Sequence, residues 1–241
     1  MPENMIDGVS AEKLFGMLGN YFNGVGARIR KGEMGEVLRE MELFSNRLNP
    51  FPSADSYLGE WAMFLNKVFG RTFDLSGAVV PGDKRSFERM LVRPQGPTMN
   101  EMLQACRRGW QGRPGFPVRS AYGDDLDAHI PEHERTADKG SYAIRCRNSR
   151  EADEELKNKS GKDIRKMAIS TMTVPERLLY EIKYYDETGE HLDVKNITLC
   201  SGSRDSDGCV PGVYWVGGEM CIRRCHPRGV GSVLRAREVV S

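Results

Sequence analysis

The chain has 241 residues, of which 39% are hydrophobic and 29% are charged. This composition is typical of a folded globular protein and excludes the highly charged, weakly hydrophobic class of disordered chains. The 35 lysines and arginines nearly equal the 34 aspartates and glutamates, so the formal net charge is +1. Such a chain has no overall basic field to hold a polyanion, and we expect no nucleic-acid partner.

No stretch of the sequence approaches the roughly 20 apolar residues that a membrane-spanning helix needs. The N-terminal sequence MPENMIDGVSAEKLFG has neither the basic flank nor the continuous apolar segment of a secretory signal. We therefore expect no membrane insertion and a cytoplasmic location by default, while surface display by another route stays open.

Helical periodicity dominates the first part of the chain. Apolar residues recur at three- and four-residue spacings over residues 11–48 and predict two amphipathic helices. A third helix is predicted to begin at Ser53 or Asp55, either of which can cap it, and to stop at Gly70. We assign these helices to a first region, residues 1–130, which is helical or α+β and whose role the sequence does not indicate.

Shorter elements follow these helices. The segments AVVP (78–81) and FERMLV (87–92) are strand-like, and a short helix is predicted over 99–106. SYAIRCR (141–147) alternates large and polar residues as a strand does, and READEELKNKS (150–160) predicts a charged helix.

The most clearly bounded element is the helix within residues 170–193. Thr173 can cap it, Pro175 and Glu176 suit its first turn, and Gly189 can end it. Its apolar side chains fall on one face: Leu178, Leu179, Ile182 and Tyr185.

Short strands are predicted for the remainder of the chain. NITLC (196–200) predicts a strand, SGSRDSDG (201–208) a turn, and residues 210–225 an irregular hairpin around two glycines. LRAREVV (234–240) predicts a closing strand. A domain of α+β class, with helices before antiparallel strands, is therefore expected over residues 131–241.

The arginines of the predicted closing strand allow two interpretations. Arg235 and Arg237 either lie on a solvated strand face or make structural hydrogen bonds within the fold.

Cysteines crowd toward the end of the chain and raise the possibility of a zinc site. Tetrahedral zinc could use Cys200, Cys209, Cys221, Cys225 and His226. Zinc knuckles pair ligands two to four residues apart, and only Cys221 and Cys225 approach that spacing. We expect no metal or cofactor. The alternative function is a zinc-dependent nucleic-acid-binding module that combines these ligands with Arg223, Arg224 and Arg228.

An enzyme is a third hypothesis. Its acid–base groups would be Asp124, Asp125, Asp127, His129 and His133. His133–Glu134 resembles half of a metalloprotease HExxH motif, but Ala137 stands where the second histidine is required. The sequence contains no GxSxG elbow, and neither Cys106 nor Cys146 has a recognisable nucleophile setting. We therefore expect no catalytic residues.

The segment from Cys200 to Ser241 has an unusual composition, because it contains no lysine and no glutamine. Within it, a regular frame (GSRxSDGxVPxVxW, then LRAREVV) alternates with residues that share no chemical theme. We call these the variable positions: Asp205, Cys209, Gly212, Tyr214, Val216, Cys221, Arg223, Cys225, His226, Arg228, Val230 and Ser232.

This pattern resembles the variable proteins of diversity-generating retroelements. The resemblance rests on TVPERLLYEIKYYDETGEHLD (173–193), TLCSGSR (198–204), SDGCVPGVYW (206–215) and LRAREVVS (234–241). In such elements adenine-directed mutagenesis turns AAC or AAT codons into NNY codons, which cannot encode Trp, Gln, Met, Lys or Glu. Every variable position carries a permitted residue type, and the stray cysteines then follow from NNY codons.

The resemblance implies a C-type lectin-like domain from about Tyr142 onward, with its variable region at about 200–241. It also implies a non-enzymatic protein that binds an unknown ligand, a protein or another macromolecule, through the variable positions. The frame is predicted to point inward through Val210, Val213, Trp215, Ile222 and Leu234. The outward set is Cys209, Gly212, Tyr214, Cys221 and Arg223. Calcium is not expected, because only Asp205 and Asp207 lie close together in this segment.

Overall fold

The computed structural model describes residue 38, residues 54–82 and residues 84–241. The helices predicted over 11–48 lie outside the described residues, except that Leu38 is helical, and the cap at Ser53 lies outside them too. The chain divides into two compact units, Met1–Glu60 and Trp61–Ser241. The boundary expected near residue 130 falls inside the second unit.

Two helices lie where the periodicity predicts them, α3 (Ala54–Phe69) and α4 (Met99–Arg108). Gly70 follows α3 with a φ of 70°, a left-handed conformation that ends a helix at little cost in glycine. A capping box at Thr98 begins α4. The remaining helical elements are α5 (Leu126–His129), the 3-10 turn Glu154–Leu156, α6 (Gly161–Lys166) and α7 (Val174–Thr188).

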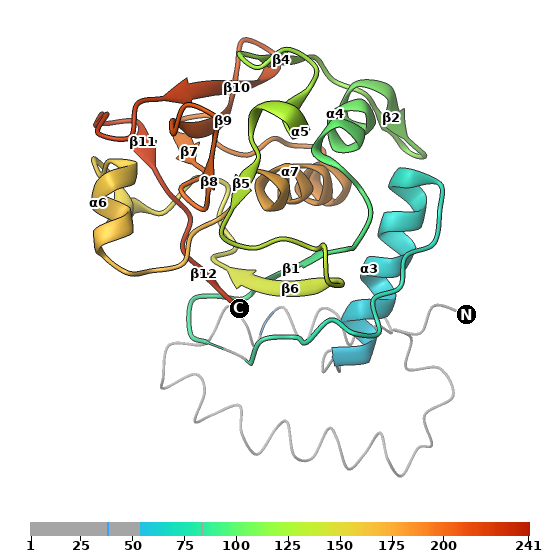
Figure 1. The fold of residues 1–241 in the computed structure, drawn as a ribbon. Helices are drawn as coiled ribbons and strands as arrows, with labels where there is room; N and C mark the ends of the chain where they lie inside the picture. Colours follow the sequence, from blue (N-terminus) through green and yellow to red (C-terminus); the bar gives the residue numbers. More distant parts are fainter. Residues whose placement is uncertain (1–37, 39–53, 83) are drawn as a thin grey trace, which may run out of the picture. The chain divides into compact units, whose positions relative to one another are not determined.

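Helix α7 begins and ends at the predicted residues. The Thr173 side chain accepts from the Glu176 backbone N–H, the Glu176 carboxylate accepts from the Thr173 N–H, and Gly189 closes the helix with a φ of 74°. Helix α7 is buried beyond its apolar face, because the polar side chains of Arg177 and Glu181 are as buried as the apolar ones. Figure 1 shows the reason, since α7 runs through the middle of the unit with strands on two sides of it.

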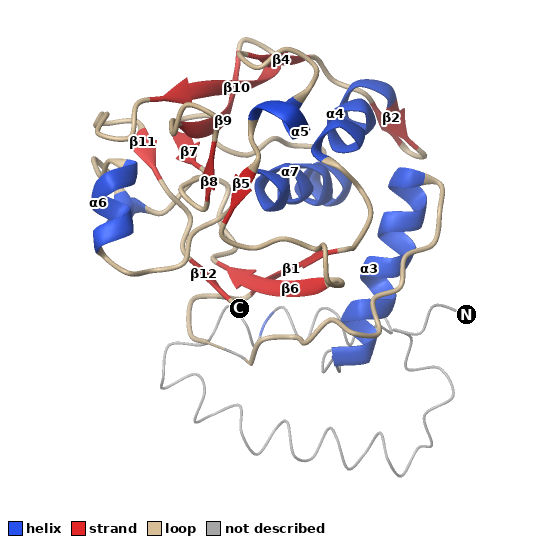
Figure 2. Ribbon diagram, viewed as in Figure 1, coloured by secondary structure: helices blue, strands red, loops and turns tan. Residues whose placement is uncertain are grey.

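The strands form two larger sheets and two short pairs (Figure 2). One sheet has the order β11-β7-β9-β10-β4, formed by Leu234–Arg235, Ile197–Leu199, Val210–Val216, Glu219–Cys225 and Val118–Ser120. The other has the order β1-β6-β12, formed by Arg89–Arg93, Tyr142–Cys146 and Val239–Val240. The pairs are β2 (Gly109–Trp110) with β3 (Arg113–Pro114), and β5 (Glu132–His133) with β8 (Ser203–Arg204).

The hairpin of β9 and β10 is regular rather than irregular. Its two turn residues, Gly217 and Gly218, have φ values of 61° and 83°. Two successive positive φ angles are those of a type I′ turn, whose twist matches that of the paired strands. The two strands therefore pair along their full length, from Val216 opposite Glu219 to Val210 opposite Cys225.

Three predicted elements differ from the structure. Residues 150–160 form only a 3-10 turn, because the Asp153 N–H donates to Ala236 O and its carboxylate accepts from Arg147 and the Glu238 N–H. Those non-local bonds compete with a regular helix. LRAREVV divides into β11 and β12, which belong to different sheets. AVVP is not a strand, whereas FERMLV contains β1 as expected.

The fold class is therefore mixed α+β, as the sequence predicts, but the strands are not all antiparallel as expected, because β10 pairs with β4 and β7 with β11 in parallel. Within the part of the chain that the structure describes, no helix is both long enough and apolar enough to cross a membrane.

Candidate functional site

The predicted alternation along the hairpin is present in the structure. Tyr214 lies opposite Cys221 and Gly212 lies opposite Arg223 in the β9–β10 ladder. Directly opposed residues of an antiparallel pair share a face of the sheet. These positions therefore share one face, which we call the variable face, while Val213 and Ile222 share the opposite face, toward α7.

Half of the twelve variable positions have solvent-exposed side chains. Cys209 and Tyr214 are half-buried, and the exposed positions are Val216, Arg223, His226, Arg228, Val230 and Ser232. Val216 is 46% exposed and Val230 is 64% exposed, values that are high for large apolar side chains in a folded unit. The face and the loop after β10 thus present apolar, basic and small polar groups together, as a recognition surface does.

Asp205 does not belong to this surface, because only 1% of its area is exposed. Its Oδ1 accepts from the backbone N–H groups of Asp207 and Cys209 at 3.0 and 2.8 Å. Its Oδ2 accepts from the Tyr122 hydroxyl at 3.2 Å and from Arg224 Nε at 2.9 Å. The carboxylate therefore shapes the turn before β9, and its assignment as a ligand-contacting position is corrected.

Gly212, Cys221 and Cys225 are also buried, although they lie on the variable face. Cys225 packs with Ile197, Leu199, Val210 and Leu234 in a small apolar cluster on this face of the sheet. Val210 and Leu234 are therefore buried as predicted, but Val210 lies on the same face as Gly212 rather than opposite it.

Strand β4 buries Cys221. It pairs in parallel with β10, so that Arg119 lies beside Cys221 with Arg119 Nη2 3.2 Å from the sulfur. Arg119 Nε also donates to Glu219 at 2.7 Å, which fixes the guanidinium over the strand. The accessible part of the variable face therefore includes Arg119, a residue that the sequence pattern did not indicate.

Trp215 is half-buried, not the fully buried core residue expected of it. Its ring stacks on His191 with centroids 3.4 Å apart and planes 4° from parallel, and Phe116 meets it edge-on at 5.6 Å. Because Trp215 lies near the end of β9, the packing that covers one side of its ring leaves part of it accessible. It remains a structural residue of the α7 side of the sheet.

The cysteines do not gather into a metal centre. Among the described residues, no three histidine, cysteine, aspartate or glutamate side chains lie where they could hold one metal ion. The geometry therefore does not favour the zinc-dependent alternative.

The acidic residues of the enzyme hypothesis each serve the local fold. Asp127 accepts from the backbone N–H groups of Met99 and Asn100 at the start of α4, at 2.9 and 3.1 Å. Asp125 caps α5, and hydrogen bonds from the Asn100 side chain and the Ala128 N–H lower the pKa of its carboxyl. Asp124 pairs with Arg107 at 2.6 Å.

Neither histidine of that hypothesis hydrogen-bonds to these carboxylates within the described chain, although His129 interacts electrostatically with Asp125 and His133 with Asp127. His129 is exposed, with its ring 6.4 Å from that of Tyr122. His133 lies 2.8 Å from the Ser203 hydroxyl on the neighbouring strand. Among the described residues, no hydrogen bond therefore joins a histidine of this hypothesis to one of its carboxylates.

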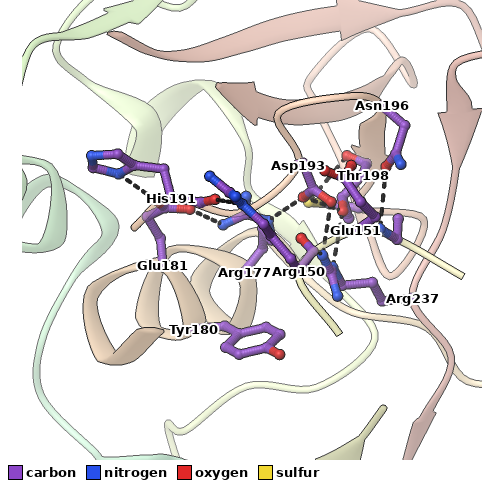
Figure 3. Close-up of polar contacts among 12 residues, drawn as sticks. Arg150, Glu151, Arg177, Tyr180, Glu181, His191, Asp193, Asn196, Thr198 and Arg237 are labelled. Atoms are coloured by element: carbon purple, nitrogen blue, oxygen red, sulfur yellow. Dashed lines mark hydrogen bonds and ion pairs between the residues drawn. The ribbon is translucent and has the colours of Figure 1, made fainter. Parts of the chain in front are cut away.

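A buried polar network supports the variable face from within (Figure 3). Arg177 of α7 donates to Asp193 Oδ2 at 2.9 Å and to Glu181 at 2.8 Å. Arg237 donates to Asp193 Oδ1 at 2.7 Å and to the Thr198 hydroxyl at 3.1 Å. Of the two possibilities for Arg237, hydrogen bonding is therefore the correct one.

The network continues to the aromatic stack. His191 Nδ1 lies 2.8 Å from the second carboxylate oxygen of Glu181, and the same imidazole stacks on Trp215. Helix α7, β7, β9 and the C-terminal segment are thus joined beneath the sheet. No local sequence pattern signals the whole network, because Arg237 lies far along the chain from Asp193 and Thr198.

Comparison of the chain with protein-family models, with curated proteins and with solved structures gives no match.

Proposed function

We propose that this chain is a non-enzymatic ligand-binding protein with a C-type lectin-like C-terminal domain whose accessible β9–β10 face and following loop are hypervariable through retroelement-directed mutagenesis. The observation that carries the proposal is the separation of two sets of residues. Val216 and Arg223 are exposed on the variable face, and His226, Arg228, Val230 and Ser232 are exposed in the loop after β10. The frame residues Val213 and Ile222 are buried on the opposite face.

The physical cost of diversity at the exposed positions is small. Surface substitutions away from special structural features usually change stability by only about ±0.5 kcal/mol. The side chains of Val216 and Val230 project from the fold, so their replacement opens no cavity in it. The β9–β10 ladder is formed by backbone groups, and neither Gly217 nor Gly218 of its turn is a variable position.

The buried polar network keeps the backbone in place while the exposed side chains change. Asp193, Thr198 and Arg237 are buried, and their mutual hydrogen bonds hold β7 and the C-terminal segment. A ligand bound to the variable face would then meet a preformed surface, which lowers the entropic cost of binding.

A displayed library tests the proposal. The codons of Tyr214, Val216, Arg223, His226 and Arg228 are randomised to NNY, and the library is selected against one fixed target protein such as lysozyme. We expect target-specific binders that unfold within a few degrees of the parent chain.

The matched control library randomises Val213 and Ile222 of the opposite face, and we expect it to yield few folded clones. Failure of the first library to give binders, or equal loss of folded clones from both libraries, would contradict the proposal.

A further inference from the structure

A small polar pocket lies apart from the variable face, where β5, β8 and the end of α6 meet. Its volume is about 170 Å³, below the range of roughly 300–1,000 Å³ that is usual for sites of drug-sized ligands. The residues that line it are Glu132, His133, Glu134, Arg165, Ser201, Gly202, Ser203 and Arg204. None of them is a variable position.

Arg204 is an unusual member of this lining. Only 8% of it is exposed, and its Nη1 donates to the backbone carbonyls of Ser201 and Ser203 at 2.8 and 2.6 Å. Within the described part of the chain, no carboxylate forms an ion pair with it. Buried charges in proteins are normally paired, as Arg177 and Arg237 are with Asp193.

A second cation and an unsatisfied hydroxyl line the same pocket. Arg165 of α6 is exposed, and after the larger effect of burial its charge lowers the pKa of Arg204, while the exposed Glu134 and Glu132 raise it. Ser201 is 4% exposed, and its Oγ has no hydrogen-bond partner among the described groups. Two guanidinium groups that repel each other thus line the pocket together with an unpaired hydroxyl. An anion with several acceptor oxygens would stabilise this arrangement by accepting hydrogen bonds from all three groups.

The remaining polar groups complete this lining. Ser203 Oγ accepts from the Val174 N–H at the start of α7 at 2.9 Å, and it lies 2.8 Å from His133 Nδ1. If the Ser203 hydroxyl donates a hydrogen bond to Nδ1, the neutral histidine carries its own proton on Nε2. Glu132 and Glu134 are exposed, so water screens their charges more than it screens the buried Arg204.

We propose that this pocket binds a phosphate group, held by Arg204 and Arg165 and by the hydroxyl of Ser201. The two arginines match a doubly charged oxyanion better than a single carboxylate, because each guanidinium can form charge-assisted hydrogen bonds. The small volume admits one such group, either free phosphate or the phosphorylated end of a larger molecule. The proposal is independent of the proposed function, since the two surfaces share no residue.

Calorimetric titration with inorganic phosphate, at an ionic strength held constant with sodium chloride, tests the site. We expect saturable binding of one phosphate per chain. Arg165→Ala and Ser201→Ala are expected to weaken it, the former by about tenfold or more, since a charge-assisted hydrogen bond contributes about 1.5–3 kcal/mol. Phosphoserine titrated in parallel distinguishes the two sources, because tighter binding than inorganic phosphate indicates a carried phosphate.

Lys166→Ala is the matched control, because Lys166 is an exposed cation on the same helix that does not line the pocket. Its phosphate affinity is expected to equal that of the unchanged chain. The proposal is overturned if phosphate heats do not exceed those of chloride, or if Lys166→Ala weakens binding as much as Arg165→Ala. It is equally overturned if Arg165→Ala and Ser201→Ala both bind as tightly as the unchanged chain.

Discussion

Arg237 Nη2 donates to Asp193 Oδ1 at 2.7 Å, with 1% of the Arg237 side chain and none of the Asp193 side chain exposed. The other carboxylate oxygen of Asp193 accepts from Arg177 Nε at 2.9 Å. One carboxylate thus pairs with two buried guanidinium groups, of which Arg177 also pairs with Glu181, and joins α7 to the C-terminal segment. The positive φ of Asp193, 55°, shows that its backbone adopts an unusual conformation to reach this place.

Asp193→Asn tests the importance of that carboxylate. The amide keeps the shape but removes the charge that compensates Arg177 and Arg237, so we expect a loss of about 3–5 kcal/mol in the free energy of unfolding. Denaturant unfolding measures it. The control is Asp207→Asn, the same change at an exposed carboxylate, which is expected to cost less than about 1 kcal/mol. If both changes lower the free energy of unfolding equally, the buried carboxylate contributes no more to stability than an exposed one does.

Gly212→Ala tests whether every variable position is free to vary. A Cβ at this position would lie 3.0 Å from both Cys225 Sγ and Ile197 Cγ2. We expect overpacking to cost about 1–3 kcal/mol in unfolding free energy. Gly77→Ala is the control, because its Cβ meets nothing within 4 Å. A Gly212→Ala protein as stable as the Gly77→Ala protein would contradict this packing.

Glu176 predicts a defined pH dependence of stability. Burial alone would raise the pKa of its carboxyl, but hydrogen bonds from Arg135, the Thr173 N–H and Tyr142 hold that pKa below its ordinary value. A carboxyl with a lowered pKa stabilises the fold above its unfolded pKa of about 4.3, and this stabilisation is lost as the pH falls through the folded pKa.

Glu176→Gln should therefore lower the unfolding free energy at neutral pH, and the deficit should shrink as the pH falls below about 4.3. Denaturant unfolding at a series of pH values measures the deficit. A deficit in unfolding free energy that stays constant across the pH series would show that the ionised carboxylate of Glu176 does not stabilise the fold.

The triple variant Arg223→Ser, His226→Asn and Arg228→Ser tests the cost of changing exposed variable positions. We expect its unfolding free energy to fall by no more than about 1.5 kcal/mol in total. Trp215→Ala should cost more, about 2–3 kcal/mol, because it removes the ring that stacks on His191 and meets Phe116. If the triple variant is less stable than Trp215→Ala, those three residues are structural.

Local signals in the sequence predict local structure well. The cap at Thr173, Glu176 in the first turn and the stop at Gly189 define α7 because a helix end satisfies its own backbone groups with nearby residues. Gly217 and Gly218 define the hairpin turn for a similar reason, since positive φ angles select glycine. The alternation of Val213 and Tyr214 between faces follows from strand geometry alone.

Non-local relationships were not predictable in this way. Nothing near Cys221 indicates that Arg119, far earlier in the chain, pairs beside it and covers its sulfur. Asp205 looks like any turn residue until Tyr122 and Arg224 are brought to it by the fold. Burial of a position in a strand therefore depends on which strand lies next to it, and composition does not specify that neighbour.

Retroelement-directed diversification acts on particular codons, so it is tested by sequencing the region that encodes residues 200–241 across a population of the source cells. We expect replacements concentrated at Val216, Arg223, His226, Arg228 and Val230, confined to NNY-encoded types, with Val213, Ile222 and Arg237 unchanged. We also expect a near-copy of this region beside a reverse transcriptase gene, differing where the copy has adenine. Replacements spread evenly over exposed and buried codons, or a region with no such copy, would show that the variable face is not diversified in this way.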